Sequence, residues 1–304
     1  MTLYYQDDHV TLYHGDSLEI LPTLDVQADA LLTDPPYFKV KNEDWDRQWA
    51  KPDEFLRWIG SFLDATKPLL APHASVWVFA SPQLATDIEI TVRDRFRVLN
   101  SIRWTKGGET AHRRADFKTY RSFASPWEGI IFAENLEAIR YIQNEWERAG
   151  WRPGPLGIAI GRDPALPRRW VQRGTVPSPE DYASLRDVLR RSGDDYLTLE
   201  YEQVRRTFNP PATRTLANDI WDFAPVRPYP GKHPCEKPAP LLRHMIEAST
   251  RPGALILDPF AGSGSTLEVA AATGRHAIGI EKSEEYCEKI ARRLENRTEQ
   301  LALI

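Results

Sequence analysis

Cysteine is scarce in this sequence, and its scarcity excludes several kinds of site. Only Cys235 and Cys287 occur among 304 residues, and they lie far apart without the spacing of metal ligands. This excludes a disulfide framework and a cysteine-rich zinc site, and it fits a protein whose thiols stay reduced. We therefore expect no bound metal.

Long apolar runs are lacking as well. No stretch approaches the roughly 18 apolar residues that span a bilayer. The first residues, MTLYYQDDHVTLYHGD, are polar and acidic, unlike a secretory signal peptide. A hydrophobic fraction of 41% and a charged fraction of 27% are typical of a globular protein. We expect a cytoplasmic protein without a membrane partner.

The chain has no excess of positive charge. Its net charge is −4, so any binding of nucleic acid would depend on local basic patches. Two segments qualify. Residues 103–121 carry six basic and two acidic side chains, and residues 148–173 carry six arginines and one aspartate.

Strand-like runs alternate with helix-like segments in the first 140 residues and again after residue 225. The expected strands are Val10–His14, Ala28–Thr33, Ser75–Ala80, Leu99–Trp104, Gly129–Ala133, Ala254–Asp258 and His276–Glu281. The expected helices are Pro52–Pro68, Pro240–Thr250, Thr266–Thr273 and Glu284–Gln300. This alternation predicts an α/β fold with a doubly wound, mostly parallel, Rossmann-like sheet.

Residues 141–213 depart from the alternation, being rich in Gly, Pro and Arg and then helical and charged. We expect an inserted, largely helical region, with residues 1–140 and 214–304 forming the main domain. Residues 157–174 predict a helix-turn-helix whose second helix presents Arg168, Arg169 and Gln172, residue types that read base edges. The alternative is an Arg-rich surface helix in a solubilising insert. Tyr196–Phe208 is expected to form a supporting helix.

The first conspicuous motif is Asp34-Pro35-Pro36-Tyr37, where the run Ala28–Thr33 ends. Two prolines cannot continue the hydrogen bonding of a strand, so the chain must leave the sheet here. By itself the motif is compatible with a stiff turn or with a site that holds a carboxylate and an aromatic ring.

The second motif follows another strand-like run. Asp258-Pro259-Phe260-Ala261-Gly262-Ser263-Gly264 leads into a helix, and the next strand ends in Glu281. Glycines let the backbone approach a ligand, and an acid at the end of the next strand is where a Rossmann-like fold binds ribose hydroxyls. A tight turn is the alternative. Both motifs follow predicted parallel strands, at the edge where open α/β sheets bind ligands.

Together the two motifs resemble those of the amino-group DNA methyltransferases that use S-adenosylmethionine. The catalytic motif of that family is Asp/Ser/Asn-Pro-Pro-Tyr/Phe/Trp, and its cofactor motif is Phe-x-Gly-x-Gly. The catalytic motif comes first here, which is similar to the β-type order. Gly15-Asp16 and the segment His233-Pro234-Cys235-Glu236-Lys237-Pro238 also resemble family segments. The resemblance covers most of residues 10–37, 75–135 and 215–300.

The resemblance implies that S-adenosylmethionine binds along this edge. Asp16 would contact its adenine, and the helix that follows Lys237 would lie beside its methionine part. The residues implied to bind the cofactor are Asp16, Thr33, Lys237, Asp258, Phe260, Ala261, Gly262, Ser263, Gly264, Thr266 and Glu281.

The catalytic residues implied are Asp34, Pro35, Pro36 and Tyr37. The Asp34 carboxylate and the Pro35 carbonyl would accept hydrogen bonds from the target amine, and Tyr37 would stack on a base flipped out of the duplex. Asp34 favours adenine N6 as the target. Cytosine N4 is the alternative, and a non-catalytic DNA-binding relative is a minor one.

The expected partner is double-stranded DNA. Lys106, Arg113, Arg114 and Lys118 in the first basic segment are predicted to contact phosphates, and a solvated charged loop is the alternative. A homodimer and an accompanying restriction endonuclease are compatible with the resemblance. The recognised DNA sequence cannot be inferred.

Overall fold

A nine-stranded sheet forms the centre of the protein. The computed structural model describes residues 2–40, 46–106, 125–191, 193–209 and 218–302. Within these residues the strand order is β1-β2-β9-β8-β3-β4-β6-β5-β7. The strands are β1 (Thr2–Gln6), β2 (Val10–His14), β3 (Ala28–Thr33), β4 (Leu70–Ala80), β5 (Arg97–Thr105), β6 (Trp127–Glu134), β7 (Ile220–Asp222), β8 (Leu255–Asp258) and β9 (His276–Glu281).

Most strand pairs are parallel, which confirms the predicted α/β fold with a mostly parallel sheet. Strands β2, β9, β8, β3 and β4 run in one direction. Strand β6 is antiparallel to both β4 and β5, and β7 is parallel to β5. The start of β6 therefore lies at the edge where the parallel strands end.

Helices cover both faces of the sheet. They are α1 (Ser17–Ile20), α2 (Pro52–Thr66), α3 (Ala85–Arg93), α9 (Ala239–Ser249), α10 (Ser265–Ala272) and α11 (Glu284–Ala302), with short 3-10 turns at Leu21–Thr23 and Lys67–Leu69. One core cluster lies under α1, α2 and α3 and includes Phe55, Ile59 and Phe62. The other lies under α9, α10 and α11 and includes Met245 and Leu267.

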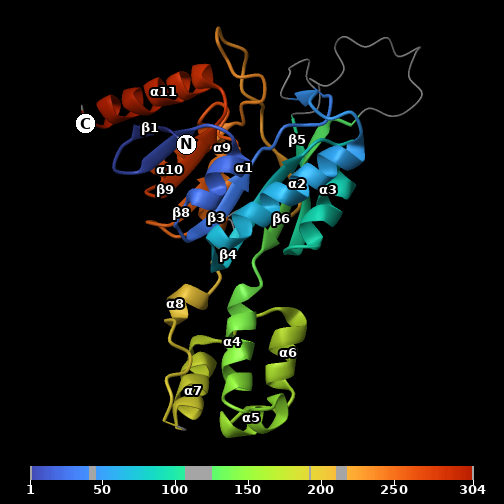
Figure 1. Cartoon of the computed structure of the whole chain (residues 1–304), viewed down its shortest axis with the longest axis vertical. Helices are drawn as coiled ribbons and strands as arrows, with labels where there is room; N and C mark the ends of the chain where they lie inside the picture. Colours follow the sequence, from blue (N-terminus) through green and yellow to red (C-terminus); the bar gives the residue numbers. More distant parts are fainter. Residues whose placement is uncertain (1, 41–45, 107–124, 192, 210–217, 303–304) are drawn as a thin grey trace.

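Five further helices form a separate lobe, which lies below the sheet in Figure 1. They are α4 (Glu137–Arg148), α5 (Pro153–Ala159), α6 (Leu166–Arg173), α7 (Pro179–Arg190) and α8 (Tyr201–Val204). The lobe has its own buried core, which includes Trp146, Trp170 and Tyr182. The helices α5 and α6 and the turn between them match the two helices expected over residues 157–174.

Charged side chains join this lobe to the amino end of the parallel strands. Arg206 Nη1 and Arg97 Nη1 lie 2.7 and 3.2 Å from Glu134 Oε1 at the end of β6. His73 Nδ1, in β4, lies 2.9 Å from the carbonyl oxygen of Gln203. The lobe is therefore attached at the edge of the sheet opposite the ends of β3, β8 and β9.

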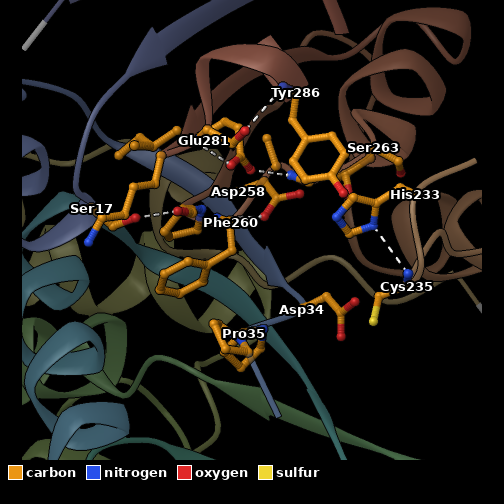
Figure 2. Close-up of a pocket in the computed structure, with 18 of the residues that line it drawn as sticks. Ser17, Asp34, Pro35, His233, Cys235, Asp258, Phe260, Ser263, Glu281 and Tyr286 are labelled. Carbon is orange, nitrogen blue, oxygen red and sulfur yellow. Dashed lines mark hydrogen bonds between the residues drawn. The ribbon is translucent and has the colours of Figure 1, made fainter. Parts of the chain in front are cut away.

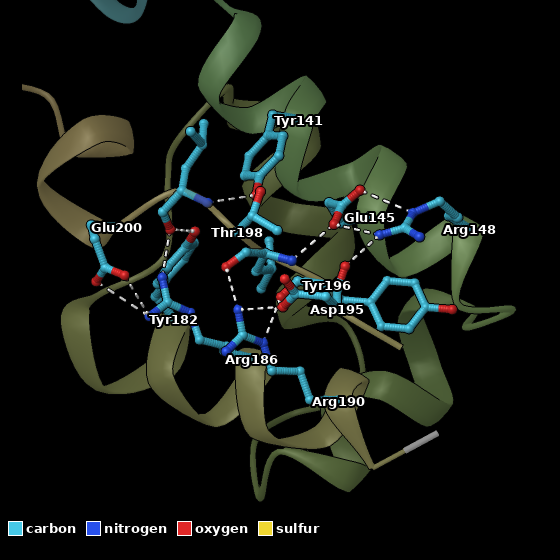
Figure 3. Close-up of polar contacts among 12 residues, drawn as sticks. Tyr141, Glu145, Arg148, Tyr182, Arg186, Arg190, Asp195, Tyr196, Thr198 and Glu200 are labelled. Atoms are coloured by element: carbon cyan, nitrogen blue, oxygen red, sulfur yellow. Dashed lines mark hydrogen bonds and ion pairs between the residues drawn. The ribbon is translucent and has the colours of Figure 1, made fainter. Parts of the chain in front are cut away.

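The helix expected over Tyr196–Phe208 is wrong except for the four residues of α8. Leu197 adopts a left-handed conformation with φ of 50°, which no helix accommodates. Side chains of α4 and α7 hold this segment instead, as Figure 3 shows. Glu145 Oε2 accepts the Leu197 N–H at 2.8 Å, and the Tyr182 hydroxyl donates to the Leu199 carbonyl at 2.7 Å.

In the described part of the chain, every helix is too short or too polar to cross a lipid bilayer.

Candidate active site

A cavity of about 260 Å³ opens at the carboxyl edge of the sheet. The segments that follow β2, β3, β8 and β9 form most of its wall, together with residues 233–237. Figure 2 shows Asp34 and Pro35 near the residues of the glycine turn, with His233 and Cys235 beside them. Both sequence motifs thus reach one cavity.

The Asp34–Tyr37 segment leaves the sheet directly after β3. Pro35 and Pro36 line the cavity, and their rings restrict the backbone from which the Pro35 carbonyl projects. Tyr37 is only 6% exposed, and its hydroxyl donates to Glu128 Oε2 at 3.1 Å. Burial raises the pKa of Tyr37 well above its usual value, so the phenol stays neutral.

The two carboxylate oxygens of Asp34 have different surroundings. Oδ2 accepts a hydrogen bond from the Lys237 ammonium. Oδ1 is buried and has no hydrogen-bond partner among the residues that the structure describes. One oxygen is therefore held by a cation, and the other is a buried acceptor without a donor in the described part of the chain.

Lys237 is 7% exposed and bonds three groups of this site. Besides Asp34, its Nζ donates to the Cys235 carbonyl at 3.3 Å and lies 3.7 Å from Glu128 Oε2. Nζ also lies 4.7 Å from the centre of the Phe79 ring. Burial lowers the pKa of Lys237, but the Asp34 and Glu128 carboxylates outweigh it and raise the pKa above its usual value. Lys237 is therefore a permanent cation.

The glycine turn connects β8 to α10. Asp258 Oδ1 accepts the Phe260 N–H at 3.2 Å, and burial raises the pKa of Asp258 to about 7. Gly262 has φ of 53°, and a Cβ there would lie 3.3 Å from the His233 ring. Glu281 Oε2 accepts the Gly262 N–H at 2.8 Å, which ties the turn to the end of β9. A side chain at position 262 would thus push against the cavity wall.

Acids and rings form the rest of the wall. Asp16 caps α1 through the Leu18 N–H at 3.0 Å and pairs with Lys282 at 2.9 Å. The Phe260 ring packs against Trp58, with ring centres 5.3 Å apart. The cavity therefore combines carboxylates with aromatic rings.

His233 closes one side of the cavity by packing its ring edge-to-face on Tyr286, with centres 4.5 Å apart. Burial and the Lys237 charge lower the pKa of His233 to about 4. The imidazole is therefore neutral at physiological pH.

Comparison with protein families identifies the family of this chain. Residues 28–293 match the family model described as DNA methylase, which covers both motifs and the helical lobe. The chain belongs to this DNA methylase family.

Curated relatives span nearly the whole methylase. The DNA adenine methyltransferase YhdJ of Escherichia coli (strain K12) is 27% identical over 292 residues, which cover 94% of this chain and 82% of the relative. The type II methyltransferase M2.DpnII of Streptococcus pneumoniae is 26% identical and covers 97% of this chain and 93% of its own.

Solved structures share the fold of the methylase. The crystal structure of the M1.HpyAVI–SAM complex has a TM-score of 0.57 at 20% identity, and the match covers 94% of this chain and 98% of that one. The PvuII DNA methyltransferase (cytosine-N4-specific) has a TM-score of 0.62 at 15% identity, covering 96% and 88%. At these identities the likeness concerns the fold.

The structure brings most predicted site residues of the methylase to the cavity. The residues that line it are Asp16, Asp34, Pro35, Pro36, Tyr37, Lys237, Asp258, Phe260, Ala261, Gly262, Ser263, Thr266 and Glu281. Two predicted residues lie behind the wall. Thr33 is fully buried at the end of β3, and Gly264 begins α10 with φ of 75°, where a Cβ would lie 2.8 Å from Ile290.

The predicted DNA-binding residues are dispersed. Lys106 donates to Glu128 at the start of β6. Arg113, Arg114 and Lys118 lie outside the described residues. Arg168, Arg169 and Gln172 lie on α6, in the lobe at the opposite edge of the sheet, and Arg169 pairs with Asp163 at 3.6 Å. Their contacts with DNA stay predictions.

Sequence reasoning missed Trp58 and Glu128. Trp58 lies on α2, whose apolar periodicity signalled a core helix and nothing more. Glu128 stands at the start of β6, and only the antiparallel pairing of that strand brings it to the carboxyl edge. No local sequence motif assigns either residue to the site.

Proposed function

We propose that this methylase transfers a methyl group from S-adenosylmethionine to the N6 amine of adenine in double-stranded DNA, after the base has been flipped out of the duplex. The observation that carries the proposal is Asp34, which lines the cavity, is held by Lys237 through one oxygen and has no donor on the other among the described residues. The name of the E. coli relative, DNA adenine methyltransferase, supports adenine as the target.

The chemistry required is the activation of a poor nucleophile. The lone pair of an exocyclic amine is delocalised into its ring, and hydrogen-bond acceptors on both N–H groups favour a tetrahedral nitrogen with a free lone pair. Asp34 Oδ1 accepts one N–H. The Pro35 carbonyl accepts the other, and Tyr37 provides a ring on which the flipped base stacks.

The side chains around the cavity fit S-adenosylmethionine, which supplies an electrophilic methyl group when bound. Its positive charges match a cavity that contains the carboxylates of Asp16, Asp258 and Glu281, and its adenine matches the aromatic side chains of Trp58 and Phe260. Gly262 keeps the turn free of a side chain. We assign cofactor contacts to these residues and to the other cavity-lining members of the predicted set.

The helical lobe is our candidate for target recognition, corresponding to the insert predicted over residues 141–213. On α6, Arg168 and Gln172 are exposed to solvent. The lobe lies at the opposite edge of the sheet from the cavity. Within one copy of the chain, target recognition and methyl transfer would therefore take place far apart. We therefore propose a homodimer, in which the lobe of one copy reads the DNA that enters the cavity of the other.

The biological setting we propose is the cytoplasm. The type II names of two relatives, M2.DpnII and M2.LlaDCHI, support a restriction-modification system with an accompanying endonuclease.

Single-molecule sequencing of DNA treated with the purified protein and S-adenosylmethionine tests the main proposal, because it reports the modified base and its sequence context together. We expect N6-methyladenine at one recurring sequence. Detection of N4-methylcytosine would show that cytosine N4 is the target. Unmethylated DNA, together with measurable cofactor binding, would indicate a non-catalytic relative.

A further inference from the structure

Glu128 belongs to a group of charged side chains next to the catalytic motif, which also includes Asp34, Lys237 and Lys106. One of its oxygens, Oε2, accepts the Tyr37 hydroxyl at 3.1 Å and lies 3.7 Å from the Lys237 ammonium. The other oxygen, Oε1, accepts a hydrogen bond from Lys106. The side chain of Glu128 is only 16% exposed, so solvent screens these interactions weakly.

The charges in this group alternate in space. Lys237 lies between the carboxylates of Asp34 and Glu128, and Glu128 lies between the ammonium groups of Lys237 and Lys106. Burial raises the pKa of Glu128, but the two lysines outweigh it and lower the pKa below its usual value. Glu128 is therefore an anion whenever the site is assembled.

This arrangement links Glu128 to both catalytic side chains. It fixes the Tyr37 ring through the hydroxyl, at the end remote from the backbone. Glu128 also pairs with the Lys237 cation, which therefore interacts with two carboxylates, those of Asp34 and Glu128.

Resting on the function proposed above, we propose that Glu128 is a positioning residue for methyl transfer. It holds the Tyr37 stacking ring and the Lys237 cation in the places where Asp34 can accept a hydrogen bond from the target amine. Glu128 itself reaches the base only through these two neighbours.

The proposal has a signature in the pH profile. The groups that act on Asp34 are Lys237, Glu128, Tyr37 and, from β8, Asp258. Burial raises the pKa of Asp34, Lys237 lowers it, and Glu128 raises it. Removing the Glu128 charge therefore lowers the pKa of Asp34, and the acidic limb of the turnover rate moves to lower pH. Loosened packing that hydrates Asp34 would move the limb the same way, so the shift supports the proposal only in a variant that keeps its melting temperature and cofactor affinity.

The test compares Glu128→Gln with Glu134→Gln in the whole 304-residue chain. Both positions lie on β6, both side chains are largely buried, and both pair with cations, but Glu134 lies at the end next to the helical lobe. Each variant is measured for methyl transfer in a single turnover across pH, for S-adenosylmethionine affinity and for thermal stability.

We expect Glu128→Gln to slow transfer about tenfold, the equivalent of one hydrogen bond to a charged group. We expect little change in its cofactor affinity, and a shift of its acidic limb to lower pH. Glu134→Gln should lower the melting temperature and leave the limb in place. An unshifted limb and wild-type transfer in Glu128→Gln would overturn the proposal.

If Glu128→Gln fails to fold, Tyr37→Phe replaces it, because that change keeps the ring and removes the hydroxyl that donates to Glu128. Slower transfer at unchanged cofactor affinity supports the proposal, and wild-type transfer contradicts it. Loss of the proposed function is a different outcome, because the wild-type protein itself would then leave adenine unmethylated.

Discussion

At the scale of single residues, the asymmetry of Asp34 accounts for the chemistry. A carboxylate exposed to water would form hydrogen bonds with solvent through both oxygens, and the target amine would have to displace water to reach it. Here Lys237 holds Oδ2, and Oδ1 is buried without a partner in the described part of the chain. The acceptor is thus oriented before the base arrives.

Asp34→Ala tests this role. We expect S-adenosylmethionine to bind as in the wild type, because the glycine turn and Glu281 are untouched, while methyl transfer falls by roughly a hundredfold or more, as on loss of one preorganised transition-state contact. Isothermal titration measures binding, and incorporation of labelled methyl groups measures transfer. Full activity in this variant would remove Asp34 from the mechanism.

Asp258 gives a prediction about stability and pH. Burial raises its pKa from 3.8 to about 7, so between these values the folded protein keeps a proton that the unfolded chain has released. The contribution of Asp258 to stability is therefore fully present below about pH 4 and is lost as the pH rises through 7. Above pH 7 the buried carboxylate costs up to about 4 kcal/mol.

Asp258→Asn should accordingly raise the melting temperature of the cofactor-free protein at pH 8 and have little effect at pH 4. Its affinity for S-adenosylmethionine should fall, because a negative charge facing a cationic ligand is lost. Thermal unfolding at the two pH values and titration calorimetry measure both effects. Equal stabilisation at both pH values would show that ionisation of Asp258 is not the cause.

At the scale of elements, the sequence predicted the helices and strands whose residues are selected by burial within the element itself. The apolar face of α2 and the buried runs of β3 and β8 were predictable because burial alone selects their residues. The edge strands β1 and β7 were not, because they are short and half exposed, and pairing with β2 and β5 holds them. Leu197 is a similar case, because only contacts from α4 and α7 account for its left-handed conformation.

The same distinction applies to the site. Asp34 and Gly262 could be predicted because each belongs to a motif directly after a strand. Glu128 could not, because its place depends on the direction of a strand about 90 residues further along the chain.

Gly264 gives a prediction at this scale, because it begins α10 and meets α11. Gly264→Ala should destabilise the fold by roughly 2–4 kcal/mol, since a left-handed alanine is strained and its Cβ would lie 2.8 Å from Ile290. Gly274→Ala is the matched control. Gly274 has φ of 72° with nothing within 4 Å of a Cβ, so only the backbone cost of about 1–2 kcal/mol applies. Urea unfolding of both variants measures the difference, and equal losses would refute the packing role of Gly264.

At the scale of the whole molecule, β6 runs from the cavity to the helical lobe. Glu128 at one end contacts the cavity-lining residues Tyr37 and Lys237, and Glu134 at the other end holds Arg206 next to the helical lobe. Six residues of strand span about 20 Å. Because β6 is paired on both sides, the lobe and the cavity are joined by a rigid element.

This separation makes the proposed homodimer testable by mixing two inactive proteins. Asp34→Ala lacks the catalytic acceptor but keeps α6, and the double variant Arg168→Ala, Gln172→Ala keeps the acceptor but lacks the predicted base readers. If one copy reads DNA for the other, the mixture should recover up to about a quarter of wild-type activity at saturating DNA, which is one productive site in half of the dimers. Transfer measured on a substrate with one site decides the question, and a mixture no more active than its parts would contradict reading in trans.

The separate core of the helical lobe has an evolutionary consequence. The lobe packs around its own tryptophans, and polar contacts at one edge join it to the sheet. A lineage that exchanged this cassette for another would keep the cavity, the glycine turn and every strand of the sheet intact. With the lobe as the DNA reader proposed above, new DNA specificities would then arise by recombination, and the catalytic machinery would not have to evolve again with each of them.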